Sequence, residues 1–136
     1  MRAEVFVDTA FLIALLRSQD AHHQGARKLA VQLAEQSSPL VTTDAVLLEL
    51  ANFFARHPLR LTAIGWIAKI RGDAGWRVER LEPDLMTRAE ARFKRFGDKD
   101  WSLTDCISME VMERRRIREV ATTDGGFAQA GFTLLL

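Results

Sequence analysis

Short apolar runs alternate with longer segments of helical periodicity along the whole chain, and this alternation limits the possible folds more than any other feature. Five runs are rich in β-branched or other apolar residues, as expected for strands: residues 4–7, 39–42, 76–81, 118–123 and 132–136. Segments with helical spacing separate them: roughly residues 9–17, 21–36, 43–56, 60–74, 84–96, 102–116 and 124–129. Strands joined through helices need crossover connections, which produce parallel pairing. We therefore expect an α/β fold with three α/β/α layers and a mostly parallel central sheet of about five strands.

The length of the chain and the positions of its prolines indicate a single domain. Its 136 residues, 48% of them hydrophobic, are enough for one compact unit with its own core. The three prolines, Pro39, Pro58 and Pro83, fall where one predicted element gives way to the next, and no Pro/Gly/Ser-rich linker is present. We expect one domain over residues 1–136.

The overall charge points to no particular polymer or membrane surface. Nineteen Lys and Arg residues against eighteen Asp and Glu residues leave a formal charge of +1, so any nucleic-acid binding must be confined to a local patch.

The single cysteine, Cys106, excludes an internal disulfide and a Cys-rich metal site, and it fits a reducing compartment. No apolar run approaches the roughly 20 residues of a membrane span. We expect a cytoplasmic protein.

Two acidic residues directly follow predicted strands. Asp8 ends the strand in "VFVDTAFL", and Asp124 ends the strand in "VATTDGGF". In an open parallel sheet, the crevice beyond the carboxyl ends of the strands is the usual working site, so these two side chains should meet there. Each acid also suits a helix cap or a turn, which is the structural alternative.

Asp105 and Glu49 extend this acidic set. Asp105, in "DKDWSLTDCISMEVM", lies three residues after Ser102, which is the spacing of a helix capping box. Glu49 lies among apolar residues of "TTDAVLLELANFFARH", where capping explains it poorly. Its carboxylate either extends past the apolar surface to water or points into the crevice.

Four neighbouring carboxylates would repel one another and bind protons unless a cation shared the site. Ligation by oxygen alone, with no Cys or His near these acids, favours a hard cation such as Mg²⁺ or Mn²⁺. Such an ion keeps several waters, which leaves room for a phosphate oxygen and a nucleophilic water. The chemistry that this set supports is phosphodiester hydrolysis.

The segments that carry these acids resemble the motifs of PIN-domain nucleases, and among them the VapC-type ribonuclease toxins of toxin–antitoxin pairs. "VFVDTAFLIALL" is similar to the first motif, "TTDAVLLELAN" to the second, "DKDWSLTDCISMEVMERRRI" to the most distinctive one and "EVATTDGGFAQAGF" to the last. The resemblance spans nearly the whole chain. It implies an endoribonuclease that hydrolyses RNA by metal-activated water, with Asp8, Glu49, Asp105 and Asp124 holding one or two Mg²⁺ or Mn²⁺ ions. It also implies a homodimer silenced by a cognate antitoxin protein.

Two further groups of side chains are candidates for supporting roles. The hydroxyls of Thr9 and Thr123 adjoin Asp8 and Asp124 and could orient them, although a hydroxyl at a helix start also serves as a cap. The candidate RNA-facing residues are basic side chains that precede the Asp105 segment and alternate with phenylalanines: Arg92, Lys94 and Arg95.

Other function classes fit the sequence less well. A phosphatase of the haloacid-dehalogenase type needs an acid two residues after the first Asp, where this chain has Ala10, and nucleotide-binding proteins need a glycine-rich loop that is missing. A non-catalytic RNA-binding or interaction module with the same fold is the alternative to a nuclease. The presence of all four acids favours the nuclease.

Overall fold

The computed structural model describes residues 2–136, and within them the strands form one five-stranded parallel sheet in the order β3-β2-β1-β4-β5. The strands are β1 (Val5–Val7), β2 (Leu40–Thr43), β3 (Trp76–Glu79), β4 (Glu119–Ala121) and β5 (Thr133–Leu134). The predicted α/β class and the parallel sheet of about five strands are confirmed. The strands are mostly shorter than the apolar runs that predicted them, because flanking residues of those runs leave the hydrogen-bonded ladder to begin turns and helices.

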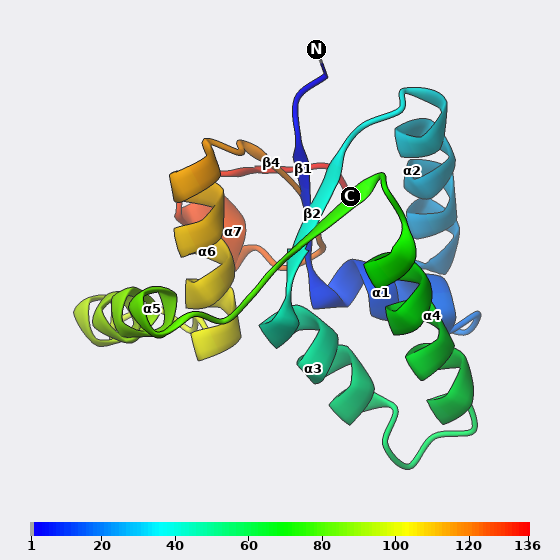
Figure 1. Ribbon diagram of the computed structural model, residues 1–136, viewed down its shortest axis with the longest axis horizontal. Helices are drawn as coiled ribbons and strands as arrows, with labels where there is room; N and C mark the ends of the chain where they lie inside the picture. The colour runs from blue at the N-terminus through cyan, green and yellow to red at the C-terminus, as the bar shows by residue number, and fades with distance from the viewer. Residues whose placement is uncertain (1) are drawn as a thin grey trace.

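Every predicted helical segment contains a helix. The helices are α1 (Thr9–Leu16), α2 (His23–Glu35), α3 (Asp44–Phe53), α4 (Arg60–Gly72), α5 (Pro83–Arg95), α6 (Leu103–Arg115) and α7 (Gly126–Gln129). Helices α1, α2 and α4 lie on one side of the sheet, and α5, α6 and α7 lie on the other (Figure 1). This placement follows from right-handed crossovers, because the chain moves outward along the sheet from β1 to β3 and then returns past β1 to β4 and β5.

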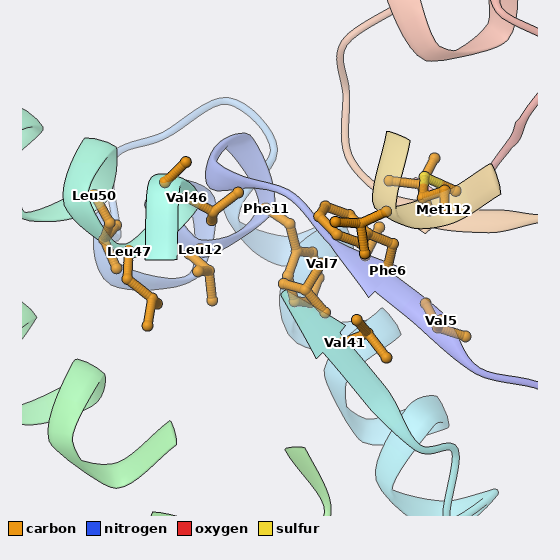
Figure 2. Close-up of a cluster of buried hydrophobic side chains, with 14 of the residues drawn as sticks. Val5, Phe6, Val7, Phe11, Leu12, Val41, Val46, Leu47, Leu50 and Met112 are labelled. Carbon is orange, nitrogen blue, oxygen red and sulfur yellow. The ribbon is translucent and has the colours of Figure 1, made fainter. Parts of the chain in front are cut away.

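The core lies on both faces of the central strand. All three residues of β1 are buried, as expected for a strand covered by helices on both sides. Figure 2 shows Phe6 extending toward α6, which carries Met112, while the buried residues of α1 and α3 form another part of the same cluster. None of the helices formed by residues 2–136 has the length and apolar character needed to span a bilayer.

The strand register brings the site-bearing segments to one edge of the sheet. Val7 of β1 pairs with Ala121 of β4, and the Asp8 amide donates to the Ala121 carbonyl at 3.2 Å. The segments after β1 and β4 therefore leave the sheet at the same edge. Helix α3 starts directly after β2, where the Thr43 hydroxyl accepts a hydrogen bond from the Val46 amide and caps the helix. Helices α3 and α6 also contact each other, which places Glu49 and Asp105 on neighbouring elements.

Candidate active site

Asp8 is a buried carboxyl group at the end of β1. It occupies the N-cap position of α1 but makes no capping hydrogen bond, and only 4% of its surface is exposed. Its Oδ2 accepts a hydrogen bond of 2.7 Å from the Thr122 hydroxyl. The pKa of Asp8 is raised to about 7: burial is the main cause, the Thr122 hydrogen bond acts in the opposite direction, and the nearby charges of Asp105 and Glu49 add to the increase. The ionised form of Asp8 therefore needs a positive partner.

Thr122 is a site residue that the sequence analysis missed. Its fully buried hydroxyl donates to Asp8 Oδ2 and accepts a hydrogen bond of 3.1 Å from the Asp124 amide. Thr122 reaches Asp8 because Val7 and Ala121 are register partners and the residues after them lie side by side, whereas the predicted role of Thr123 beside Asp124 stays a prediction. The signal that identifies Thr122 is thus the pairing of two distant strands, which no local motif contains.

Thr9, the other predicted hydroxyl, follows Asp8 and is buried. Its Oγ1 has no hydrogen-bond partner among the described residues. A buried, unpaired hydroxyl beside a buried carboxyl group is uncommon, because leaving such a group unsatisfied costs about 1–3 kcal/mol. This oxygen is one of the features that favour a polar ligand at the site.

Asp105 combines the two interpretations that its sequence position allowed. The Ser102 hydroxyl accepts from the Asp105 amide at 3.0 Å, and Asp105 Oδ2 accepts from the Ser102 amide at 2.9 Å, so the capping box is present. Nevertheless the side chain is buried, and burial raises its pKa, with further contributions from the charges of Asp124 and Glu49. Asp105 therefore caps α6 and belongs to the acidic cluster.

Glu49 and Asp124 are the other two predicted acids, and both influence the buried pair. Glu49 is half-buried on α3, and its charge acts on both Asp8 and Asp105. Asp124 is also half-buried; its Oδ1 accepts a 2.9 Å hydrogen bond from the Gly126 amide, and its charge acts on Asp105. The structure thus brings together the four predicted acids, which come from four separate segments of the chain.

The donor set fits a hard divalent cation. Among residues 2–136, no three Asp, Glu, His or Cys side chains stand close enough to enclose an ion directly between them. Mg²⁺ does not require such an enclosure, because proteins commonly hold it through one or two carboxylates and leave its other positions to water or phosphate. Asp8 and Asp105 are buried, and their raised pKa values mark a place where a cation would relieve the repulsion.

An open pocket has Glu49, one of the four acids, in its lining. It has a volume of about 330 Å³ and lies between α3 and α6. Glu49 and Asn52 supply polar groups on the α3 side, and Thr104 supplies one on the α6 side. Leu48 and Leu81 add apolar walls that remain exposed in the structure. The lining of the pocket is therefore partly polar and partly apolar.

The predicted RNA-facing residues behave differently from one another. Arg92 is held between helices: its Nε contacts Glu110 Oε2 at 2.7 Å and its Nη2 contacts Glu113 Oε2 at 2.8 Å. This guanidinium therefore links α5 and α6, and the predicted RNA contact of Arg92 stays a prediction. Lys94 and Arg95 are exposed, and Arg95 lies 5.1 Å from the ring centre of Phe96.

The comparisons with known proteins agree with this geometry. A profile of the PIN domain matches residues 5–133. The chain is 32% identical over 128 residues to the 23S rRNA-specific endonuclease VapC20 of Mycobacterium tuberculosis, covering 94% of this chain and 95% of that protein. The crystal structure of that VapC20, described as a sarcin–ricin loop cleaving toxin, matches with a TM-score of 0.83 and 31% identity, over 95% of this chain and 96% of that one.

Two more distant structures share the fold. FitAcB from Neisseria gonorrhoeae matches with a TM-score of 0.67 and 14% identity, over 97% of this chain and 96% of that one. DNA-bound VapBC from Salmonella typhimurium matches with a TM-score of 0.65 and 13% identity, over 98% of this chain and 97% of that one. The profile match, the VapC20 relative and the acidic edge of the sheet lead to the same conclusion. The chain belongs to the PIN-domain nuclease family, whose members use divalent metal ions.

Proposed function

We propose that this protein is a Mg²⁺- or Mn²⁺-dependent endoribonuclease, acting as the toxin of a toxin–antitoxin pair through one domain over residues 1–136. The observation that carries the proposal is the acidic cluster: two buried carboxyl groups, Asp8 and Asp105, with Glu49 and Asp124 beside them at the carboxyl edge of the sheet. The relationship to VapC20, a protein named as an rRNA endonuclease, supports RNA as the substrate.

The four acids have different roles in this proposal, according to their positions. Asp8 and Asp105 are the central metal ligands, because they are the most buried and each has a fixed carboxylate through Thr122 or Ser102. Glu49 is a further ligand or orients the attacking water from the α3 side. Asp124 acts as a second-ion or water-mediated ligand. The bound ion supplies charge neutralisation at the scissile phosphate and lowers the pKa of a water molecule.

The reaction is hydrolysis by water, so the attacking group is not the 2′-OH of the substrate. The protein residues exclude bulk solvent from the two central carboxylates, and the phosphate reaches them through the pocket beside Glu49. Cleavage of this kind leaves no 2′,3′-cyclic phosphate. The exposed basic side chains of Lys94 and Arg95 support substrate binding by attracting the RNA backbone.

Ribosomal RNA is the first substrate to examine, because the 32%-identical relative is named for 23S rRNA and a solved structure of it for the sarcin–ricin loop. An rRNA substrate would place the protein in the cytoplasm. The alternative function is a non-catalytic RNA-binding module, which would bind the same RNA without cutting it.

Two protein partners complete the proposal. A cognate antitoxin would cover the acidic site, as implied by the relationship to VapC toxins. A second copy of the chain would pack against the α3–α4 face, defined here as the exposed apolar side chains Leu48, Phe53, Leu61 and Ile64. Water-exposed apolar groups gathered on two adjacent helices are typical of an interaction surface.

The test is cleavage of ribosomes and total RNA by the purified, partner-free protein with Mg²⁺ or Mn²⁺, with EDTA as the metal-removal control. We expect discrete cuts that EDTA abolishes and that Asp105→Asn reduces by at least about a hundredfold, because a metal ligand is lost while the amide can still cap α6. Asp98→Asn, in the exposed part of the same segment, is the matched control and should cut normally.

The ends of the fragments distinguish the mechanism. Hydroxyl and phosphate ends without a cyclic phosphate support hydrolysis by water. Cuts that persist in EDTA, or cyclic phosphate ends, would contradict the proposed chemistry. Retained RNA binding with no cuts in any substrate or metal would favour the non-catalytic alternative.

A further inference from the structure

Trp101 is a buried side chain next to the acidic site to which the proposed chemistry assigns no role. It immediately precedes Ser102, the residue that caps α6 and holds Asp105. Only 7% of its surface is exposed, although the residues on both sides of it are exposed. Its ring lies 5.0 Å from that of Phe96, at the end of α5. The indole is therefore fixed from the side of α5 at the point where α6 begins.

The other side of the indole contacts α7. Its Nε1 donates a hydrogen bond of 3.1 Å to Gln129 Oε1. A Cβ atom added to Gly126 would lie only 2.9 Å from Trp101 Cδ1 and 3.2 Å from Nε1, closer than packed carbon atoms normally approach. A side chain at position 126 would therefore displace the indole, and glycine permits this close approach.

Gly126 also holds Asp124. Its amide donates to Asp124 Oδ1 at 2.9 Å, and the Asp124 amide donates to the Thr122 hydroxyl. The contacts thus run without a break from Asp105 through Ser102 and Trp101 to Gly126 and then to Asp124. These are two acids whose charges already influence each other.

We propose that Trp101 and Gly126 form a clamp that sets the position of Asp124 relative to Asp105. In this role Trp101 is a positioning residue: it touches neither substrate nor metal, and it acts through the backbone of Gly126. The proposal rests on the proposed metal-dependent function, because the clamp matters for catalysis only if both acids serve the same ion or ions. It explains why the segment before α6 contains a buried aromatic residue between charged and polar neighbours.

The first experiment measures Mn²⁺ affinity by the loss of the free-ion electron paramagnetic resonance signal. We expect Trp101→Phe, which removes the N–H donor and one ring, to weaken Mn²⁺ binding about tenfold, as usual for residues that support metal ligands. Gln129→Leu should produce a smaller loss in the same direction. Trp66→Phe, a half-buried tryptophan on α4, is the matched control and should bind like the wild type.

A double-mutant cycle tests the route through Asp124. In the Asp124→Asn background, Trp101→Phe should change Mn²⁺ affinity by less than about twofold, because the carboxylate that the clamp positions is already gone. An undiminished loss in that background, or wild-type affinity in the single variant, would overturn the clamp while leaving the nuclease proposal intact. Thermal unfolding of each variant reports any general loss of the fold.

The second experiment needs no metal and so separates the clamp from the nuclease proposal. Amide hydrogen exchange should be faster in Trp101→Phe at Gly126 and Asp124, whose N–H groups are hydrogen-bonded in this segment, and unchanged in α4. Unchanged exchange at both amides would refute the clamp. Faster exchange in a protein that binds no Mn²⁺ would retain the clamp and refute the metal-dependent function.

Discussion

Asp8 is a deeply buried ionisable group, and its surroundings determine whether it carries a proton. The Thr122 hydroxyl donates a hydrogen bond to Asp8 Oδ2, and the charges of Asp105 and Glu49 oppose the ionisation of Asp8. A carboxyl group in this environment is stable either protonated or beside a cation. Proton and metal therefore compete for the same residue, and two expectations follow at the scale of single residues.

Without metal, the stability of the fold should fall as the pH rises from about 4 to about 7. Across that window the folded state retains a proton on Asp8, whose pKa is about 7, while the unfolded chain has lost it at the ordinary value of 3.8. The difference amounts to at most about 4 kcal/mol. We expect Asp8→Asn to be more stable than the wild type at pH 8 and about equal at pH 4, as measured by urea unfolding in EDTA.

The contrary result would be equal pH dependence in the two proteins, which would mean that Asp8 is ionised at little cost in the metal-free fold. Added Mg²⁺ provides the matching control. It should stabilise the wild type more at pH 8 than at pH 5, because binding requires the deprotonated carboxylate, and it should stabilise Asp8→Asn much less.

The Thr122 hydroxyl should matter more than that of its neighbour. Thr122→Val removes the donor to Asp8 Oδ2 and leaves the Asp124 amide without its acceptor. We expect this variant to lose about 10- to 100-fold in Mn²⁺ affinity or turnover, as is usual for groups that orient metal ligands. Thr123→Val keeps both hydrogen bonds. An equal loss in the two variants would show that the hydroxyl of Thr122 does not orient Asp8.

At the scale of elements, helices α5 and α6 are joined by a little-exposed ion pair. The side chains of Arg92 and Glu110 are 12% and 17% exposed, and Glu113 adds a second contact to the same guanidinium. Helix α6 carries Asp105 at its first turn, so the ion pair holds the helix whose N-terminus forms part of the site. Arg92 thus supports the site from a distance.

Arg92→Met should destabilise the fold without weakening RNA binding directly. Removing the guanidinium leaves the Glu110 carboxylate unpaired in a little-exposed position, which we expect to cost about 2 kcal/mol. Lys94→Met, an exposed neighbour on the same helix, should stay within about 0.5 kcal/mol of the wild type. Chemical unfolding gives both values. A stable Arg92→Met protein with an increased KM for RNA would instead support the predicted RNA contact.

At the scale of the whole molecule, more than half of the large exposed apolar residues lie on α3 and α4. Seven large apolar side chains are exposed among the described residues, and four of them form the α3–α4 face. Glu49 lies on the same helix as two of those four, so a partner seated on this face would lie beside the acidic site. Assembly and catalysis would then share α3.

A charge on the α3–α4 face should disrupt the proposed dimer. Leu61, at 80% exposure, has little part in the core of one chain, so Leu61→Glu should produce a folded monomer. Val31→Glu, on α2, introduces the same charge at another exposed apolar residue and should leave the dimer intact. Light scattering coupled to size-exclusion chromatography gives both masses. A wild-type monomer at tens of micromolar would contradict the proposal.

Sequence patterns were sufficient for the elements of this fold, because apolar periodicity reflects which faces of a strand or helix leave water. The same patterns are the basis on which the four acids were predicted as site residues. Asp8 and Asp124 end strands, Asp105 follows a capping serine, and Glu49 lies where no cap explains it. Each of these signals is local, within a few residues of the side chain concerned.

The tertiary structure decided which side chains meet. Thr122 faces Asp8 because β1 and β4, more than 100 residues apart in sequence, pair in one register. Arg92 belongs to an ion pair because α5 packs against α6, a contact that no local pattern around Arg92 predicts. Residue types and local periodicity determine what each segment becomes, whereas partners depend on packing between segments that the local sequence does not encode.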